Sequence, residues 1–133
     1  DQVVFLSDYA HHPSEIKQSV LSIRELYKDK KITAIFQPHL YTRTRDFYQF
    51  ADSLSLLDEV ILVDIYPARE TPIPGVTSKL IYDNLRPGIE KSMCKKEEIL
   101  NILKDKNIEV LITLGAGDID NYVPEIKELL EKR

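Results

Sequence analysis

The side chains of this sequence best suited to binding an anionic ligand are two histidines and an arginine. His11 and His39 carry imidazoles, which donate hydrogen bonds to carboxylates and exchange protons near neutral pH. Arg43 carries a guanidinium fork that matches a carboxylate or phosphate, at roughly 1.5–3 kcal/mol for each charged hydrogen bond. Asp8 can accept a hydrogen bond from a sugar hydroxyl or an ammonium group, and Tyr9 offers an aromatic wall. These residue types indicate ligand binding and proton transfer.

Several of these residues also have a purely structural interpretation. Asp8 can cap the helix that follows it, and for His12 we favour a capping role at the helix that begins with Pro13. Arg43 and Arg45 lie two positions apart, so they cannot share a face of a loop or of a first helical turn. We therefore expect one of them to point into the site and the other to pack or to face water.

Other kinds of site are poorly supported. Adjacent residues such as His11 and His12 rarely both point at one ion, and no cysteine pair accompanies the histidines, so we predict no bound metal. No Ser-His-Asp or Cys-His arrangement is recognisable. The turn at residues 115–118, Gly-Ala-Gly-Asp, can present backbone N–H groups to an anion, but it lacks the spacing of a dinucleotide-binding motif. Close packing of a strand on a helix explains its glycines equally well.

The elements that position these residues follow from alternating apolar runs and segments of helical period. Strands are expected at residues 3–6, 32–36, 60–65 and 110–114, with a weaker candidate at 89–93. Helices are expected to begin near residues 13, 44, 77, 99 and 118.

The second of these helices is expected to have Thr44 as its cap and Asp46 in its first turn. Its apolar stripe is expected to run from Phe47 through Phe50 to Leu57. Nearly continuous apolar strands that alternate with helices indicate a parallel sheet covered on both faces. We predict one domain over residues 1–133, with an α/β fold: a Rossmann-like, doubly wound, mostly parallel sheet.

In such a sheet, ligands bind beyond the carboxyl ends of the strands. All three histidines, with three of the arginines, follow the ends of the four strong strands. The opposite edge offers only connectors of Lys, Asp, Glu and Asn, such as residues 28–31 and 104–107. The sequence therefore predicts that Asp8, His11, His39 and Arg43 share one cleft at the carboxyl edge.

Composition excludes several classes of protein. The net charge of -4 argues against a general nucleic-acid binder, because no large surface is available to neutralise phosphates. No apolar run approaches the roughly 20 residues of a membrane helix, so we expect no membrane insertion. The single cysteine, Cys94, suits a reducing cytoplasm. The chain enters a strand almost at once and has no initiator Met, which we interpret as a fragment of something longer.

Four stretches resemble the C-terminal domain of the Mur ligase family, and in particular of its UDP-N-acetylmuramate–L-alanine ligases. They are DYAHHP at 8–13, FQPHLYTRTR at 36–45, DIYPARE followed by PIPG at 64–75, and GAGDI at 115–119. They occur in the family's order, and the resemblance covers essentially the whole chain. The first stretch alone indicates some Mur ligase, whereas the second is typical of the alanine-adding members.

The resemblance implies the amino-acid-binding domain of a cytoplasmic, three-domain enzyme of peptidoglycan synthesis. The central domain would carry the P-loop for ATP and Mg²⁺, and the N-terminal domain would hold UDP-N-acetylmuramate. The family reaction transfers the γ-phosphoryl group of ATP to the muramoyl carboxylate, and the amine of L-alanine then attacks the acyl phosphate. This domain would contribute positioning and charge stabilisation.

By position, the resemblance also implies residue roles. Asp8 would bind near the ribose of ATP, with His11 beside it, and Tyr9 would wall a pocket for one methyl group. His11 and His39 would face the reacting centre or the alanine carboxylate, which Arg43 would clamp. These are the catalytic, substrate-binding and ATP-binding positions we expect.

The chain departs from the family pattern at Leu40, where many members have an arginine. It also contains neither a P-loop motif nor a UDP-sugar domain, so we expect it to be inactive alone. Alternative hypotheses are a stand-alone Rossmann-type module that binds a nucleotide or an acidic metabolite, the related ligase that recycles murein tripeptide, and a zinc-dependent hydrolase.

Overall fold

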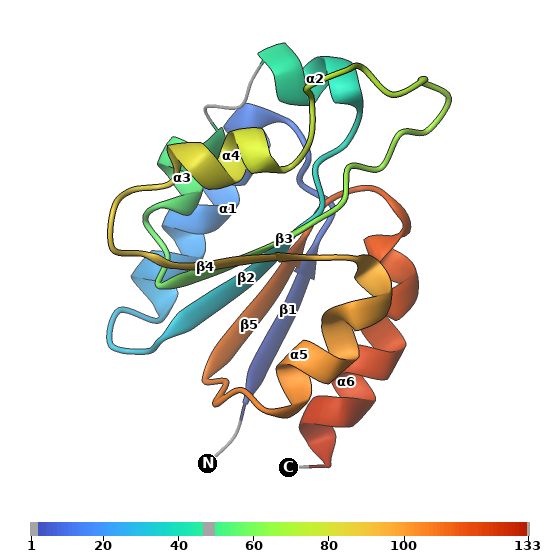
Figure 1. Ribbon diagram of the computed structural model, residues 1–133. Helices are drawn as coiled ribbons and strands as arrows, with labels where there is room; N and C mark the ends of the chain where they lie inside the picture. The colour runs from blue at the N-terminus through green and yellow to red at the C-terminus, as the bar shows by residue number, and fades with distance from the viewer. Residues whose placement is uncertain (1–2, 47–49, 133) are drawn as a thin grey trace.

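A sheet of five parallel strands forms the centre of the computed structural model, which describes residues 3–46 and 50–132 (Figure 1). The strands are β1 (Val4–Asp8), β2 (Ile32–Phe36), β3 (Glu59–Val63), β4 (Glu90–Cys94) and β5 (Val110–Leu114). Their order is β1-β5-β2-β3-β4, and every neighbouring pair is parallel. The predicted fold class is confirmed, and so is the weaker strand candidate, which is β4.

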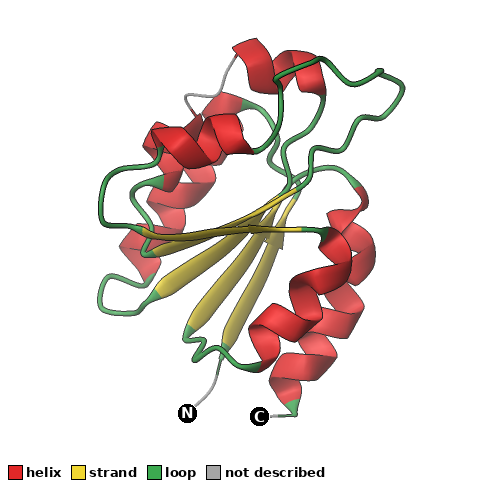
Figure 2. Ribbon diagram, viewed as in Figure 1, coloured by secondary structure: helices red, strands yellow, loops and turns green. Residues whose placement is uncertain are grey.

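The helices lie on both faces of this sheet (Figure 2). One face carries α1 (Pro13–Leu26), α3 (Phe50–Leu54) and α4 (Lys79–Asn84), and the other carries α5 (Ile99–Lys104) and α6 (Val123–Glu131). Two short 3-10 helices, η1 (Lys96–Glu98) and η2 (Asp118–Tyr122), lead into α5 and α6. The remaining helix, α2 (Tyr41–Asp46), lies beyond the carboxyl edge of the sheet.

Side-chain alternation along the strands builds a core on each face. In β2, Ala34 and Phe36 join the core beneath α1, whereas Ile35 joins the core beneath α5 and α6. Every residue of β2, β3 and β5 is buried, as expected for strands covered on both sides. The edge strand β4 is partly exposed and carries charged residues, which oppose edge-to-edge pairing.

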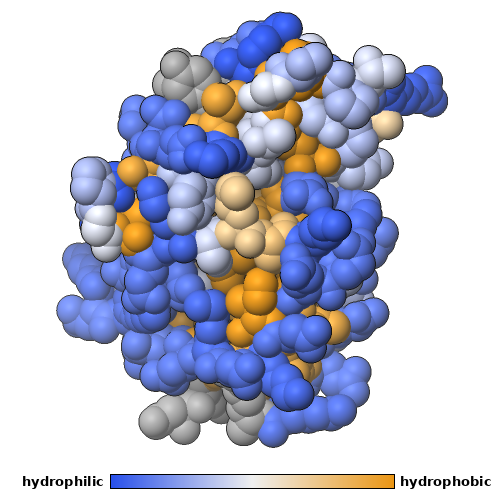
Figure 3. All heavy atoms as spheres, viewed as in Figure 1, coloured by the Kyte–Doolittle hydropathy of each residue, from blue (hydrophilic) through white to orange (hydrophobic). Residues whose placement is uncertain are grey.

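The surface on the β4 side is hydrophilic at its margins, with apolar side chains along its middle (Figure 3). Met93 of β4 is one apolar side chain that remains exposed, at 45%. Within the described residues, no helix combines the length and the apolar character that crossing a bilayer would require.

The region around Thr44 differs from the prediction. The expected helix beginning at a Thr44 cap is instead two helices, α2 and α3, and Thr44 lies buried inside α2 with its hydroxyl donating to the Leu40 carbonyl. Asp46 is the last residue of α2. Leu40 precedes the helix with a left-handed φ of 72°, a conformation that apolar periodicity cannot reveal. Phe47 lies outside the described residues.

Other helix starts follow the expected chemistry more closely. His12 is the N-cap residue of α1 and Pro13 its first residue, as predicted. Glu15, three residues after the cap, accepts the His12 backbone N–H at 3.1 Å, which satisfies a donor that has no partner within the helix. The closing helix begins as η2 and continues as α6, because Pro124 suits the first turn of an α-helix rather than its interior.

Candidate functional site

The carboxyl ends of the three central strands lie level with one another. Phe36 at the end of β2 is in register with Leu114 of β5 and with Leu62 of β3. The backbone continues the pairing beyond β2 and β3, where Leu40 N–H donates to the Tyr66 carbonyl and Tyr66 N–H to the Pro38 carbonyl, each at 2.8 Å. The loops that follow these strands are therefore held side by side.

A cluster of His11, His39, Arg43 and Tyr66 forms at this edge. The imidazole centroids of His11 and His39 are 5.1 Å apart, and the ring of Tyr66 stacks on His39 at 5.7 Å with 21° between the planes. Arg43 Nη1 lies 3.2 Å from His39 Nδ1. The structure thus brings together three of the residues that the sequence singled out, from the loop after β1, the loop after β2 and helix α2.

The contact with Arg43 decides the proton position on His39. A guanidinium has only donors, so His39 Nδ1 accepts the hydrogen bond and the ring proton sits on Nε2. Burial lowers the pKa of His39, and the electrostatic effects of His11 and Arg43 lower it further, while Glu70 opposes them. His39 is accordingly neutral at neutral pH, with Nε2–H as a donor.

His11 has the complementary arrangement. Its Nδ1 lies 2.9 Å from the Tyr9 carbonyl oxygen, and because a carbonyl only accepts, Nδ1 carries a proton. In the neutral ring, Nε2 is then the acceptor. The pair therefore combines one imidazole that offers a donor with another that offers an acceptor.

Asp8 and Tyr9 direct their polar atoms elsewhere. The Asp8 carboxylate accepts the Ala10 backbone N–H at 2.8 Å and the Ser19 hydroxyl at 2.5 Å, which ties the end of β1 to α1. The Tyr9 hydroxyl donates to Asp120 at 2.8 Å, and this hydrogen bond raises the pKa of Tyr9. Both residues lie at the carboxyl edge, but these contacts turn their side chains toward α1 and η2 rather than toward Arg43.

The two arginines of α2 point in different directions, as their spacing predicts. Arg45 is exposed and forms an ion pair with Asp46 at 2.8 Å, whereas Arg43 is half-buried against His39. Its hydrogen bond with Asp46 raises the pKa of Arg45. Arg43 is therefore the arginine of this pair that can reach a ligand beside the histidines.

The turn after β5 is built for close packing. A Cβ at Gly115, where φ is 137°, would lie 2.8 Å from the Gln37 carbonyl oxygen, and a Cβ at Gly117 would lie 2.5 Å from Tyr66 Cγ. These contacts favour the packing interpretation of the glycines over an anion site. The turn packs against Tyr66, and Tyr66 stacks on His39, so the turn supports the cluster through Tyr66.

Gln37 is a buried residue that was not among the predicted site residues. Its Nε2 donates to Asp118 at 2.6 Å and its Oε1 accepts the Ile119 N–H at 2.8 Å, so it fastens β2 to the turn after β5. Burial raises the pKa of Asp118, but hydrogen bonds from Lys96 and Gln37 outweigh it and lower the pKa overall. The signal in the sequence that could have identified Gln37 is a polar residue directly after an apolar strand.

Comparison with known proteins agrees with the motifs. Residues 1–119 match the family model described as Mur ligase, glutamate ligase domain. The chain belongs to the Mur ligase family. It is 84% identical over 134 aligned residues to a UDP-N-acetylmuramate–L-alanine ligase from Phocaeicola vulgatus. The alignment covers all of this chain and 29% of that protein. The chain therefore spans about 29% of the length of this curated relative.

Solved structures place this Mur ligase domain in the same fold. A UDP-N-acetylmuramate-alanine ligase from Thermotoga maritima is similar with a TM-score of 0.74 at 28% identity, over 96% of this chain and 27% of that one. A murein peptide ligase from Psychrobacter arcticus is similar with a TM-score of 0.72 over 98% of this chain and 28% of that one. At 19% identity, the second likeness concerns the fold alone.

Leu40, the departure from the family pattern, has a backbone role in this Mur ligase domain. It is half-buried, its N–H binds the Tyr66 carbonyl, and its own carbonyl accepts from the backbone N–H of Thr44. An apolar side chain cannot bind a carboxylate by hydrogen bonds. At this edge of the domain, Arg43, which contacts His39, is thus the residue that can bind a carboxylate in place of the family's usual arginine.

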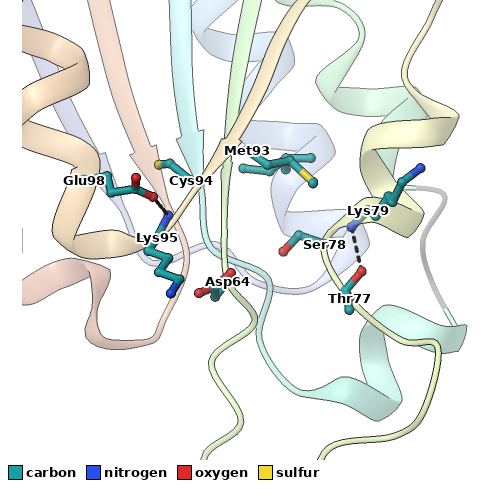
Figure 4. Close-up of a pocket in the computed structure, with 9 residues that line it drawn as sticks. Asp64, Thr77, Ser78, Lys79, Met93, Cys94, Lys95 and Glu98 are labelled. Carbon is teal, nitrogen blue, oxygen red and sulfur yellow. Dashed lines mark hydrogen bonds between the residues drawn. The ribbon is translucent and has the colours of Figure 1, made fainter.

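A hollow of about 230 Å³ lies beyond the ends of β3 and β4 (Figure 4). Asp64, Ser78, Cys94 and Lys95 are among the residues that line it, so it is separate from the histidine cluster. Burial raises the pKa of Cys94 to about 11, and nearby carboxylates add to the effect. Its thiol is protonated at neutral pH and is a poor nucleophile.

Proposed function

We propose that this chain is the C-terminal, amino-acid-binding domain of a three-domain, ATP-dependent ligase of the cytoplasm. The ligase would join L-alanine to the lactyl carboxylate of UDP-N-acetylmuramate through an acyl phosphate, in peptidoglycan synthesis. The main support is the contact between Arg43 and a neutral His39 with His11 alongside, at the edge where a parallel sheet binds ligands. The likeness to alanine-adding ligases supports the choice of substrate.

Arg43 would bind the carboxylate of the amino acid. A guanidinium has five N–H donors, so the hydrogen bond to His39 leaves enough of them for a two-pronged contact. His39 would add its Nε2–H as a further donor, either to the same carboxylate or to the oxyanion that forms during attack. Because His39 is neutral, its Nδ1 can accept from Arg43 while its Nε2–H points to the ligand as a donor.

His11 would handle the proton of the amine. An amino acid reaches the site as an ammonium ion, and its nitrogen can attack an acyl phosphate only after losing a proton. The acceptor Nε2 of His11, next to the donor ring of His39, suits this transfer. General base catalysis by a positioned imidazole is worth roughly 10²–10⁴-fold in rate. In this proposal Tyr9, whose hydroxyl is held by Asp120, would offer only the face of its ring as a wall for the alanine methyl group.

The residues of this domain fit only a small part of ATP. Each oxygen of the Asp8 carboxylate accepts one internal hydrogen bond, which leaves it able to accept another from a ribose hydroxyl. No group of three His, Cys, Asp or Glu side chains among residues 3–46 and 50–132 could hold a metal ion. We therefore assign the phosphates and Mg²⁺, which would neutralise charge during phosphoryl transfer, to the central domain.

The test uses the full-length protein that contains this domain. We expect it to consume ATP and join L-alanine to UDP-N-acetylmuramate in preference to glycine, L-serine or murein tripeptide. Arg43→Ala should raise the KM for L-alanine at least about 10-fold, a loss of about 1.4 kcal/mol or more, with little change in the KM for ATP. Arg45→Ala is the matched control and should leave both constants unchanged. Preference for the tripeptide, or an unchanged alanine KM in Arg43→Ala, would overturn the proposal.

A further inference from the structure

A carboxylate from the loop after β3 holds the start of α2. Glu70 Oε1 accepts the Thr42 backbone N–H at 3.1 Å, and Glu70 Oε2 accepts the Thr42 hydroxyl at 2.5 Å. Both oxygens of one side chain are thus engaged by one residue 28 positions earlier in the chain. The hydrogen bonds from Thr42 lower the pKa of Glu70, so the carboxylate is ionised at neutral pH.

Helix α2, which Glu70 contacts, needs partners outside the helix to fix its position. A helix of six residues is far too short to be stable alone, and its first N–H groups have no partner within the helix. Leu40, which precedes it, supplies only a backbone carbonyl to Thr44. A carboxylate at the N-terminus both accepts an unpaired N–H and complements the helix dipole.

Arg43 is the residue next to Thr42 in this helix. Its guanidinium lies against His39, which is anchored separately by its bridge to Tyr66. The distance between Arg43 and His39 therefore depends on where α2 sits relative to the loop after β3. Glu70 is the side chain that spans these two segments.

We infer that Glu70 is a positioning residue, which sets the affinity for the amino-acid substrate by holding Arg43 against His39 through Thr42. The inference rests on the proposed function of Arg43. The same contact keeps the Glu70 carboxylate occupied, so that it does not take the place of the substrate carboxylate on Arg43. Glu70 itself touches no reacting atom in this scheme.

The experiment measures kcat and KM for L-alanine, and KM for ATP, in full-length ligase with substitutions in this domain. Glu70→Ala should raise the alanine KM about 5-fold or more and leave the ATP KM within about 2-fold. Glu70→Gln keeps the side-chain length and one acceptor, so it should recover most of the wild-type KM. The control is Glu98→Ala, which removes a glutamate that accepts a backbone N–H from Lys95 away from the site and should leave the alanine KM unchanged.

The double variant Glu70→Ala with Arg43→Ala separates positioning from other roles. Once Arg43 is gone there is nothing left to position, so the double variant should have the alanine KM of Arg43→Ala alone. If Arg43→Ala raises KM but Glu70→Ala does not, the inference fails and the proposed function stands. If the two effects multiply, Glu70 acts independently of Arg43 and the inference also fails. If Arg43→Ala has no effect, the proposed function fails first.

Discussion

Gly117→Ala offers a sharp test of how the turn after β5 supports the histidine cluster. The backbone of Gly117 has φ -96° and ψ -155°, which alanine adopts without strain. The added methyl carbon would nevertheless lie 2.5 Å from Tyr66 Cγ and 2.6 Å from Gln37 Oε1. Both neighbours would have to move by about 1 Å to reach ordinary van der Waals distance.

The energetic cost follows from these contacts. Overpacking of this kind costs about 1–3 kcal/mol. A shift of Gln37 would also weaken its hydrogen bonds to Asp118 and Ile119, each worth roughly 1 kcal/mol. For a chain of this length, a loss of 1–3 kcal/mol lowers Tm by roughly 3–12 °C.

The same substitution should be visible at His39. If Tyr66 moves away from the imidazole, His39 becomes more exposed and its lowered pKa should rise toward the ordinary value. The assay is thermal unfolding of the 133-residue chain, together with an NMR pH titration of the three imidazoles, in which His39→Gln identifies the His39 signal.

Gly88→Ala is the matched control. At Gly88 φ is 87° and a Cβ would meet nothing within 4 Å, so this substitution adds backbone strain of roughly 1 kcal/mol without any clash. It should lower Tm and leave the His39 titration unchanged. An unchanged Tm and an unchanged His39 pKa in Gly117→Ala would refute the argument that this turn packs against the cluster.

Two further predictions concern the cluster and the residue beside it. The pKa of His39 is lowered on folding, so between that value and about 6.5 the unfolded chain binds more protons than the folded one. The free energy of unfolding, measured by urea titration, should therefore fall as the pH drops below about 6.5. His39→Gln should reduce this dependence of the unfolding free energy on pH. A stronger dependence in His39→Gln would contradict a lowered pKa at His39. Leu40→Ile keeps the side-chain volume but places a β-branched residue at φ 72°, and should destabilise the chain by about 1 kcal/mol or more. The control Leu21→Ile, on an exposed position of α1, should cost only a few tenths of a kcal/mol, and equal costs would contradict the strain at Leu40.

The sheet and its functional edge could be predicted because their signals are local. Strands buried on both faces have nearly continuous apolar runs, which a single buried threonine interrupts in β2 and in β5. The residue after each run falls at the carboxyl edge. The gathering of His11, His39 and Arg43 followed from that placement. The start of α2 at Tyr41 rather than after a Thr44 cap could not be predicted, because it follows the left-handed backbone of Leu40.

The directions of the side chains, and their long-range hydrogen-bond partners, also could not be predicted from the sequence. Asp8 and Tyr9 occupy the expected edge, yet their partners, Ser19 and Asp120, are 11 and 111 positions away. Glu70 reaches Thr42 across 28 positions. Such pairings depend on which loops meet, and neither periodicity nor capping rules, which act within a few residues, contain that information.

The way the cluster is assembled explains why so small a helix can present the key arginine. His11, His39, Tyr66 and Gly117 come from the loops after β1, β2, β3 and β5, and each packs against another member of the set. The parallel sheet fixes where these loops start, because its strand ends are in register. Arg43 alone stands on a helix outside this frame, so its position depends on a few polar contacts. Helix α2 has few stabilising contacts of its own and is attached to the rigid carboxyl edge of the sheet. Loss of one hydrogen-bonded carboxylate, that of Glu70, can therefore change substrate affinity without unfolding the domain.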